Sequence, residues 1–539
     1  MNCITVLFVG TIVLSCFSPC FINAQEYVTV SIQEGDVRGQ VESTRTNKTM
    51  YSFRGIPYAE PPVGDLRFQP PVTKAAWTGV RDALEFGSAC TQATYGSEDC
   101  LYLNVFTPAM PTEGDALKAV MVWIHGGCFT AGKANLYKPH YFVDNDVVFV
   151  SMNYRLGLLG FLSTGDEVVP GNMALKDQVE ALRWVQRNVA AFGGDPERVT
   201  IFGQSAGGAS IHYHVLSPLS KGLYKNAIAM SGSALSPWGF SRNATDRAIR
   251  FAQYLGFSGQ NTTELVDFLK SVDARTLAND IYYALSEEDS QSIGTCVWAP
   301  SAEPEHEGAF ITEEPWRLVA EGRYNRVPFI SGVTDLELVN NIHGNATLAT
   351  EEGIRHFNEN FEAIIGCDLR LPTRAERLNG ARAVKQFYYN GSDITVQDNF
   401  TTALLDSHMF FVEGVDAVVR NMANYSSEPV YYYEFTYNDG PFNRYPEGVG
   451  HAIDIAYMFL SFWLDPTSDG AILRDQMTAM WTNFAKYDNP TPELNSMLTQ
   501  KWEAYNESLP FYMELTSPLK PGMRLYEPYM NFWHSLLPY

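Results

Sequence analysis

The sequence predicts an α/β fold, in which a large, mostly parallel central sheet is flanked by helices. Three strand-like runs support this prediction, at residues 119–124, 198–202 and 327–332. Each run leads into a loop that carries glycine or acidic residues, and the segment ASIHYHVLS after the second run is apolar enough to begin a buried helix. Alternation of strands with helices is the pattern of α/β proteins.

The N-terminus predicts export. Residues 1–24 contain no charged side chain, include an apolar stretch from Ile4 to Leu14 and end in Ile22-Asn23-Ala24, which is typical of a secretory signal peptide. The alternative is a buried N-terminal helix. We expect a secreted, extracellular protein in which residues 25–539 form one domain with no membrane anchor, because no later stretch is long and apolar enough to span a bilayer.

Glycosylation and charge agree with this compartment. A formal net charge of -23 repels phosphate backbones and anionic lipids, so we expect no nucleic-acid partner; the acidity itself keeps an exported protein soluble. Sequons of the form N-x-[ST] make eight asparagines candidates for glycosylation: Asn47, Asn243, Asn261, Asn345, Asn390, Asn399, Asn424 and Asn506.

The segment IFGQSAGG places Ser205 between the second strand-like run and the apolar segment. This is the context of a G-x-S-x-G nucleophile elbow, a sharp turn that exposes a serine at the end of a sheet. The alternative is an ordinary polar turn. The strand before Ser205 and the helix after it favour the nucleophile.

A serine nucleophile needs oxyanion donors, a general base and an acid that orients the base. The first strand-like run ends in His125-Gly126-Gly127, typical of an oxyanion loop in an α/β-hydrolase fold. His451 follows a glycine-bearing loop and is the candidate base, whereas His212 and His214 are expected to pack inside the helix after Ser205.

Two carboxylates compete for the acid. The third strand-like run is followed by both Asp335 and Glu337, and either one gives the chain order of nucleophile, acid and histidine that α/β-hydrolases use. Spacing alone leaves the choice between them open.

Five cysteines remain after the signal peptide is removed, so at least one thiol is free. Cys90 and Cys100 are close in sequence and predict a disulfide. Cys128 is expected to be a free thiol, because pairing it would pull the oxyanion loop out of line. Cys296 and Cys367 have no obvious mates. Zinc is not expected, since neither C-x-x-C nor H-E-x-x-H occurs.

Several longer motifs identify a family. From about Val28 to the C-terminus, segments such as FRGIPYAEPPVGDLRF, SEDCLYLNVFTP and NYRLGLLGFL resemble the type B carboxylesterases of the cholinesterase and carboxylesterase family. The resemblance implies the catalytic triad Ser205, Glu337 and His451, and oxyanion donors at the N–H groups of Gly127, Cys128 and Ala206.

The resemblance also implies supporting residues. It places ion pairs between Arg67 and Glu98 and between Arg155 and Asp195, a hydrogen bond from Ser231 to the catalytic acid, and Trp238 and Trp298 in the lining of the acyl pocket. Bulky aromatic residues are equally typical of a core, so an interpretation of both tryptophans as core residues stays open.

Departures from the family pattern restrict the class of substrate that we expect. The loop TQATYGSED between Cys90 and Cys100 lacks the tryptophan that binds a quaternary ammonium in cholinesterases, and neutral Gln204 precedes the nucleophile where glutamate is frequent. These departures indicate that the chain is not a cholinesterase. The triad implied by the resemblance predicts a serine esterase that cleaves a small apolar ester through an acyl-enzyme, with no metal or organic cofactor.

Three hypotheses remain. The first is a carboxylesterase of broad specificity. The second is a specialised juvenile hormone or odorant esterase, whose G-Q-S-A-G and G-x-x-H-x-x-D patterns this chain shares. The third is a non-catalytic adhesion module of the same fold. The oligomeric state is not predicted.

Overall fold

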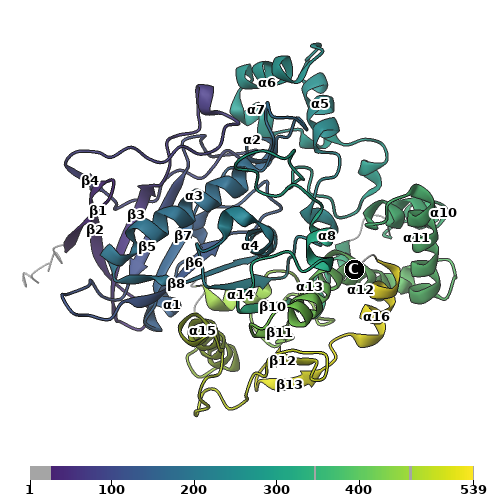
Figure 1. Ribbon diagram of the computed structural model, residues 1–539. Helices are drawn as coiled ribbons and strands as arrows, with labels where there is room; N and C mark the ends of the chain where they lie inside the picture. Colours follow the sequence, from purple (N-terminus) through teal and green to yellow (C-terminus); the bar gives the residue numbers. More distant parts are fainter. Residues whose placement is uncertain (1–25, 345–347, 460–463, 538–539) are drawn as a thin grey trace, which may run out of the picture.

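The computed structural model describes residues 26–344, 348–459 and 464–537 (Figure 1). The predicted signal peptide, residues 1–24, and the sequon residue Asn345 lie outside these described residues. Among the seven described sequon asparagines, six are exposed and Asn399 is half-buried. No helix in the described part of the chain is long and apolar enough to cross a membrane.

A thirteen-stranded sheet forms the centre of the described chain, in the order β1-β2-β3-β5-β7-β6-β8-β9-β10-β11-β12-β13, with β4 paired to β2. The strands are β1 (Tyr27–Ile32), β2 (Gly35–Ser43), β3 (Thr49–Pro57), β4 (Val80–Asp82), β5 (Tyr102–Thr107), β6 (Lys118–Ile124), β7 (Val148–Met152), β8 (Gly194–Gln204), β9 (Asn226–Met230), β10 (Phe329–Thr334), β11 (Val430–Phe435), β12 (Phe511–Leu515) and β13 (Lys520–Met523).

The middle of the sheet is parallel, from β7 through β6, β8, β9, β10 and β11 to β12. Antiparallel pairing joins β1, β2, β3, β5 and β7 at one side, and β12 and β13 at the other. The predicted runs at residues 119–124 and 198–202 lie within β6 and β8, and the run at residues 327–332 overlaps β10.

Sixteen α-helices are described. They are α1 (His140–Asp144), α2 (Gly157–Phe161), α3 (Met173–Asn188), α4 (Ala206–Leu216), α5 (Ala244–Tyr254), α6 (Thr262–Ser271), α7 (Ala274–Ala278), α8 (Pro315–Ala320), α9 (Asn341–Gly344), α10 (Glu351–Asp368), α11 (Arg374–Tyr389), α12 (Asn399–Ser407), α13 (Glu413–Tyr425), α14 (Ile453–Met458), α15 (Asp469–Tyr487) and α16 (Glu527–Leu536).

Helices cover both faces of the sheet. In β6, Val122 and Ile124 pack into a hydrophobic cluster that includes residues of α3, α4 and α13, whereas Met121 and Trp123 pack into a second cluster with residues of α1 and α15. Figure 1 shows α3 and α4 on one side of the strands and α15 on the other. Successive side chains of a strand point to opposite faces, so a strand covered on both sides is apolar throughout.

This topology gathers the candidate residues. The parallel strands β6, β8 and β10 are neighbours or near neighbours, and their carboxyl ends lie at the same edge of the sheet. The segment after β6 begins at His125, β8 is followed by Ser205, and β10 is followed by Asp335. His451 reaches this edge from the loop between β11 and α14.

Candidate active site

Ser205 forms the connection between β8 and α4 and has an unusual backbone conformation, with φ 61° and ψ -126°. Such a conformation costs roughly 1–3 kcal/mol and persists only where the surroundings enforce it. Here the N–H of Ser205 donates to the carbonyl oxygen of Met230 at 2.8 Å. A Cβ at Gly207 would lie 2.1 Å from the carbonyl oxygen of Ile124, so the turn requires glycine at that position.

The imidazole of His451 is hydrogen-bonded to a buried carboxylate. Its Nδ1–H donates to Oε2 of Glu337 at 2.6 Å, and the Glu337 side chain is fully buried. The other oxygen, Oε1, accepts the hydroxyl of Ser231 at 2.6 Å and the N–H of Thr334 at 2.8 Å. With each carboxylate oxygen engaged, Glu337 holds the ring in one orientation and one tautomer.

The second ring nitrogen of His451 faces the end of β8. Nε2 of Gln204 lies 3.2 Å from Nε2 of His451, so the amide donates to the ring nitrogen that carries no proton. Gln204 directly precedes Ser205. The imidazole therefore lies between Glu337 on one side and the turn between β8 and α4 on the other.

Asp335, the rival carboxylate, has a different partner. Its Oδ1 accepts the N–H of Val449 at 2.6 Å, which ties the loop before His451 to the end of β10. Burial raises the pKa of Asp335 to about 6. Asp335 thus supports the histidine loop, and the imidazole bonds to Glu337.

A further buried carboxyl group, Asp454, lies close to this pair. It is fully buried, and burial, followed by the charge of Glu337, raises its pKa to about 7. Its Oδ1 accepts the N–H of Ile455 at 2.9 Å, and the hydroxyl of Tyr433 donates to Oδ2 at 3.4 Å.

The glycine loop after β6 packs directly against the elbow. A Cβ at Gly126 would lie 2.5 Å from the carbonyl oxygen of Gln204 and 2.9 Å from Cβ of Ser205. The N–H groups of Gly127, Cys128 and Ala206 donate hydrogen bonds to no other described residue. Three such N–H groups beside a serine are the arrangement that an oxyanion requires.

The remaining histidines near the elbow are structural. His125 is buried, and burial lowers its pKa to about 4, so the neutral ring donates from Nδ1 to the carbonyl oxygen of Gly126 at 2.8 Å. His212 and His214 are buried inside α4, and burial lowers both pKa values to about 3.

The structure corrects one cysteine prediction. Cys128 is not a free thiol: it forms a disulfide with Cys296, and the two Cα atoms are 5.6 Å apart. The expected displacement of the loop does not occur, because Gly126 packs against the elbow in the same structure in which Cys128 is paired. Cys90 and Cys100 form a second disulfide, and Cys367 is the free cysteine of the described chain.

An aromatic cluster extends from His451. The ring of Phe411 lies 4.5 Å from the imidazole, the ring of Trp238 lies 5.6 Å from Phe411, and Phe129 of the glycine loop lies 6.4 Å from Trp238. The indole N–H of Trp238 donates to the carbonyl oxygen of Phe410 at 2.9 Å. This cluster forms an apolar wall between the imidazole and the glycine loop.

Trp298 has a different aromatic neighbour. Its ring centroid lies 5.8 Å from that of Phe251 of α5, and the residue is 1% exposed. The sequence also gave no reason to select Phe411, which stands in a π-helical turn, residues 408–412, between α12 and α13. Such turns often occur at functional sites but have no sequence signature of their own.

A cleft of about 650 Å³ opens beside the imidazole. His451 lines it together with Val339, Pro441, Phe442, Tyr445 and Ile453. These neighbours are apolar or aromatic, but Asn340, Asn443 and Arg444 also line the cleft, so its wall is mixed. Such a lining suits a largely apolar ligand that also carries polar groups.

Comparison with known proteins agrees with this geometry. A family model described as "Carboxylesterase family" matches residues 26–533. The chain belongs to the carboxylesterase family. Its fold is accordingly the α/β-hydrolase fold, and the parallel sheet with helices on both faces agrees with it.

Insect and mammalian esterases are among the relatives of this carboxylesterase. It is 37% identical to Esterase FE4 of Myzus persicae over 80% of this chain and 76% of that protein. It is 34% identical to juvenile hormone esterase of Tribolium castaneum, over 88% and 85% of the two chains. It is also 34% identical to acylcarnitine hydrolase of Mus musculus, over 94% and 90%.

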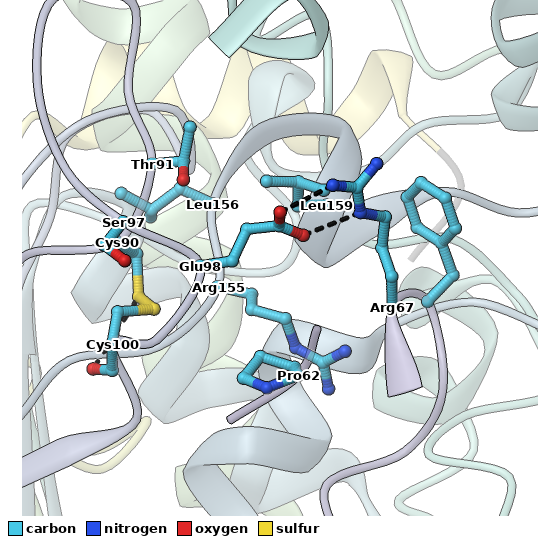
Figure 2. A pocket seen from close by; sticks show the side chains of 11 residues that line it. Pro62, Arg67, Cys90, Thr91, Ser97, Glu98, Cys100, Arg155, Leu156 and Leu159 are labelled. Carbon is cyan, nitrogen blue, oxygen red and sulfur yellow. Dashed lines mark hydrogen bonds and ion pairs between the residues drawn. A yellow bond between two sulfur atoms is a disulfide. The ribbon is translucent and has the colours of Figure 1, made fainter. Parts of the chain in front are cut away.

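Two ion pairs brace the loops of this carboxylesterase. Figure 2 shows the guanidinium of Arg67 facing the carboxylate of Glu98, with an Nε to Oε1 distance of 2.7 Å. The predicted pair of Arg155 with Asp195 is wrong. Arg155 instead binds Asp177 of α3, with Nη2 2.7 Å from Oδ1, and Asp195 binds Arg198 at 2.7 Å. Asp195 lies at the start of β8, whereas Arg155 follows the carboxyl end of β7, so the two residues lie at opposite edges of the parallel strands.

Proposed function

We propose that this carboxylesterase hydrolyses small apolar carboxylic esters through a covalent acyl-enzyme on Ser205. The observation that carries the proposal is the position of His451, which binds Glu337 through Nδ1–H and presents Nε2 to the end of β8. A neutral imidazole with one nitrogen fixed by a carboxylate and the other free of a proton is a general base.

In the first half of the reaction, Nε2 of His451 takes the proton of the Ser205 hydroxyl as the oxygen attacks the ester carbonyl carbon. The negative charge that develops on the carbonyl oxygen is stabilised by the N–H groups of Gly127, Cys128 and Ala206. The imidazolium then gives its proton to the alcohol oxygen, and the carbon–oxygen bond of the ester breaks.

In the second half, water takes the place of the alcohol. His451 removes a proton from water, the resulting hydroxide attacks the acyl carbon, and the proton returns to the Ser205 oxygen as the carboxylic acid leaves. The Glu337 carboxylate stabilises the imidazolium in both halves. The proposed chemistry uses side chains and backbone of this chain, with no cofactor.

The apolar surroundings support an apolar substrate. Trp238, Phe411 and Phe129 form the wall on one side of the imidazole, and the cleft of about 650 Å³ lies beside it. We infer that one arm of the ester packs against the aromatic cluster and the other occupies the cleft. A carboxylesterase of broad specificity is therefore the first candidate function.

A specialised juvenile hormone or odorant esterase is the second candidate. The size of the cleft favours it, as does the similarity to juvenile hormone esterase of Tribolium castaneum. Hydrolysis rates for short-chain acyl esters, long-chain acyl esters and terpenoid methyl esters separate the two candidates. A preference of at least about tenfold for one long ester supports specialisation. A complete set of serine, histidine and carboxylate residues supports catalysis over an adhesion module.

We further propose that residues 25–539 act as one exported unit. The predicted signal peptide and the exposed sequons, such as Asn47 and Asn506, support export. Mass spectrometry of protein secreted by a eukaryotic host tests this, because it reports both the mature N-terminus and the glycans.

The catalytic proposal is tested by Ser205→Ala. We expect kcat to fall by about 10^5 to 10^6, since the nucleophile is lost while the fold is kept. Labelling by an organophosphate is expected to disappear as well. The exposed Ser290→Ala is the matched control and keeps both properties. Labelling of another serine in the Ser205→Ala variant contradicts the assignment.

A further inference from the structure

The Cys128–Cys296 disulfide joins the glycine loop after β6 to the segment that precedes Trp298, and 168 residues separate the two cysteines. Cys296 is 4% exposed. Arg247 of α5 donates from Nη1 to the carbonyl oxygens of Cys296 and Val297 at 3.4 and 3.0 Å. The Cys296 end of the disulfide is therefore anchored in the interior.

The Cys128 end lies in a strained stretch of backbone. Cys128 and Phe129 both have positive φ angles, 52° and 57°. For residues other than glycine this left-handed conformation is unfavourable. A change of φ at Cys128 turns the Gly127–Cys128 peptide plane relative to the backbone that follows. Relaxation of φ towards the usual negative values would therefore turn the N–H of Cys128 away from the elbow.

Hydrogen bonds hold the residues on either side. The N–H groups of Thr130 and Ala131 both donate to the carbonyl oxygen of Gly127 at 3.0 Å, and the N–H of Gly157 donates to the carbonyl oxygen of Phe129 at 2.8 Å. Cys128 itself is held through its side chain, by the bond to Cys296.

We propose that the Cys128–Cys296 disulfide positions the oxyanion donors. It holds Cys128 in its left-handed conformation, so that the N–H groups of Gly127 and Cys128 point at the oxygen that becomes negatively charged. The inference rests on the proposed acyl transfer at Ser205. The two sulfur atoms take no part in the chemistry, and both side chains are positioning groups.

The proposal has a kinetic signature. Oxyanion donors act on charge that develops in the transition state, so their misplacement lowers kcat and leaves KM nearly unchanged. A purely structural disulfide affects the free energy of unfolding instead. A fall in kcat at nearly constant KM therefore indicates a positioning role, whereas a change in the free energy of unfolding alone indicates a structural one.

The pairing is checked first, by peptide mapping of the unreduced protein. We expect Cys128 in one cross-linked peptide with Cys296, and Cys367 carrying an alkylating label after unfolding. A Cys128 peptide that takes the label overturns the inference.

Two double variants then test the role. In Cys128→Ala/Cys296→Ala we expect kcat to fall about 10- to 100-fold, with KM within about twofold of the parent. In Cys128→Gly/Cys296→Ala we expect most of kcat to return, because glycine adopts a positive φ without strain. Cys367→Ala, which removes the free thiol, is the control and keeps the parental kcat.

A transition-state analogue gives an independent readout. A trifluoromethyl ketone forms a hemiketal with the Ser205 oxygen, and its oxyanion occupies the same donors. We expect its inhibition constant to rise in the alanine double variant by the factor that kcat falls. Both double variants lack the disulfide and lose similar stability, so unfolding cannot explain a difference between them.

The results separate this inference from the proposed function. A parental kcat in the alanine double variant, or equal losses in the alanine and glycine variants, overturns the positioning role while Ser205→Ala remains inactive. Activity that survives in Ser205→Ala overturns the proposed function itself.

Discussion

His451 and Glu337 are joined twice, by a hydrogen bond of 2.6 Å from Nδ1–H to Oε2 and by a backbone hydrogen bond of 2.9 Å from the N–H of His451 to the carbonyl oxygen of Glu337. The backbone bond fixes the distance between the histidine loop and the segment after β10. The side-chain bond then has only to set the orientation of the ring. We therefore expect changes to the Glu337 carboxylate to affect the proposed catalysis more than the fold.

The first prediction concerns the choice of acid. Glu337→Gln is expected to keep the fold and lower kcat by about 10^4, since an amide presents the wrong partner to Nδ1 and cannot stabilise the imidazolium. Asp335→Asn is expected to change kcat less than about threefold, because the amide oxygen can still accept the N–H of Val449. Steady-state kinetics of both variants test this choice. A larger fall in kcat for Asp335→Asn than for Glu337→Gln assigns the role of the acid to Asp335 instead.

The second prediction concerns the amide beside the imidazole. Gln204→Glu places a carboxylate about where the amide stands, 3.2 Å from Nε2 of His451, and a negative charge there favours the protonated ring. The acidic limb of the profile of kcat/KM against pH is therefore expected to move to higher pH. Gln204→Met, which has similar volume and no charge, is the control. If the acidic limb of the kcat/KM profile does not move in Gln204→Glu, residue 204 does not contact His451 in solution.

The third prediction concerns stability against pH. Burial raises the pKa of Asp454 from 3.8 to about 7, so the folded protein keeps this proton in a pH range where the unfolded chain has lost it. The free energy of unfolding therefore falls as pH rises through this range, by at most about 1.4 kcal/mol per pH unit from this group. Asp454→Asn lacks that contribution.

Urea unfolding of the parent and of Asp454→Asn at several pH values measures the effect. We expect the variant to gain stability relative to the parent between about pH 4 and pH 7, and the difference to be constant below that range. A difference that stays constant throughout shows that Asp454 is ionised in the folded protein.

The fourth prediction separates the two tryptophans. Trp238→Phe removes part of the aromatic wall near His451, so kcat/KM for esters of bulky acids is expected to rise about tenfold relative to acetate esters. Trp298→Phe is the matched change at a residue packed against Phe251. It is expected to lower the unfolding midpoint and leave the ratio unchanged. If Trp298→Phe also raises kcat/KM for esters of bulky acids relative to acetate esters, Trp298 lines the pocket as well.

Local patterns in the sequence predicted the fold class well. The run in β6 is apolar on both faces, and β8 is buried from Val199 to Gln204. The glycines around Ser205 are required by backbone contacts that any elbow of this kind makes. Chain order restricted the acid and base to a few residues. Spacing could not choose between Asp335 and Glu337, because both follow the same strand within three residues.

Contacts between distant segments were harder to predict. The pairing of Cys128 with Cys296 depends on where the segment before Trp298 crosses the glycine loop, which no local pattern encodes. For Arg155, the family resemblance implied Asp195, and only the path of α3 brings Asp177 to it. Phe411 reaches His451 through the π-helical turn between α12 and α13, for which the sequence has no signal.

The long span of the Cys128–Cys296 bond has a consequence for biosynthesis. Cys128 leaves the ribosome 168 residues before its partner. At about 5–20 residues per second, it waits roughly 10 to 30 s with an unpaired thiol. Cys90 and Cys100, only 10 residues apart, emerge earlier and can close their small loop during this delay. Closing it first removes the two nearest competing thiols, so the order of synthesis favours the correct partner for Cys128 before the catalytic edge of the sheet is complete.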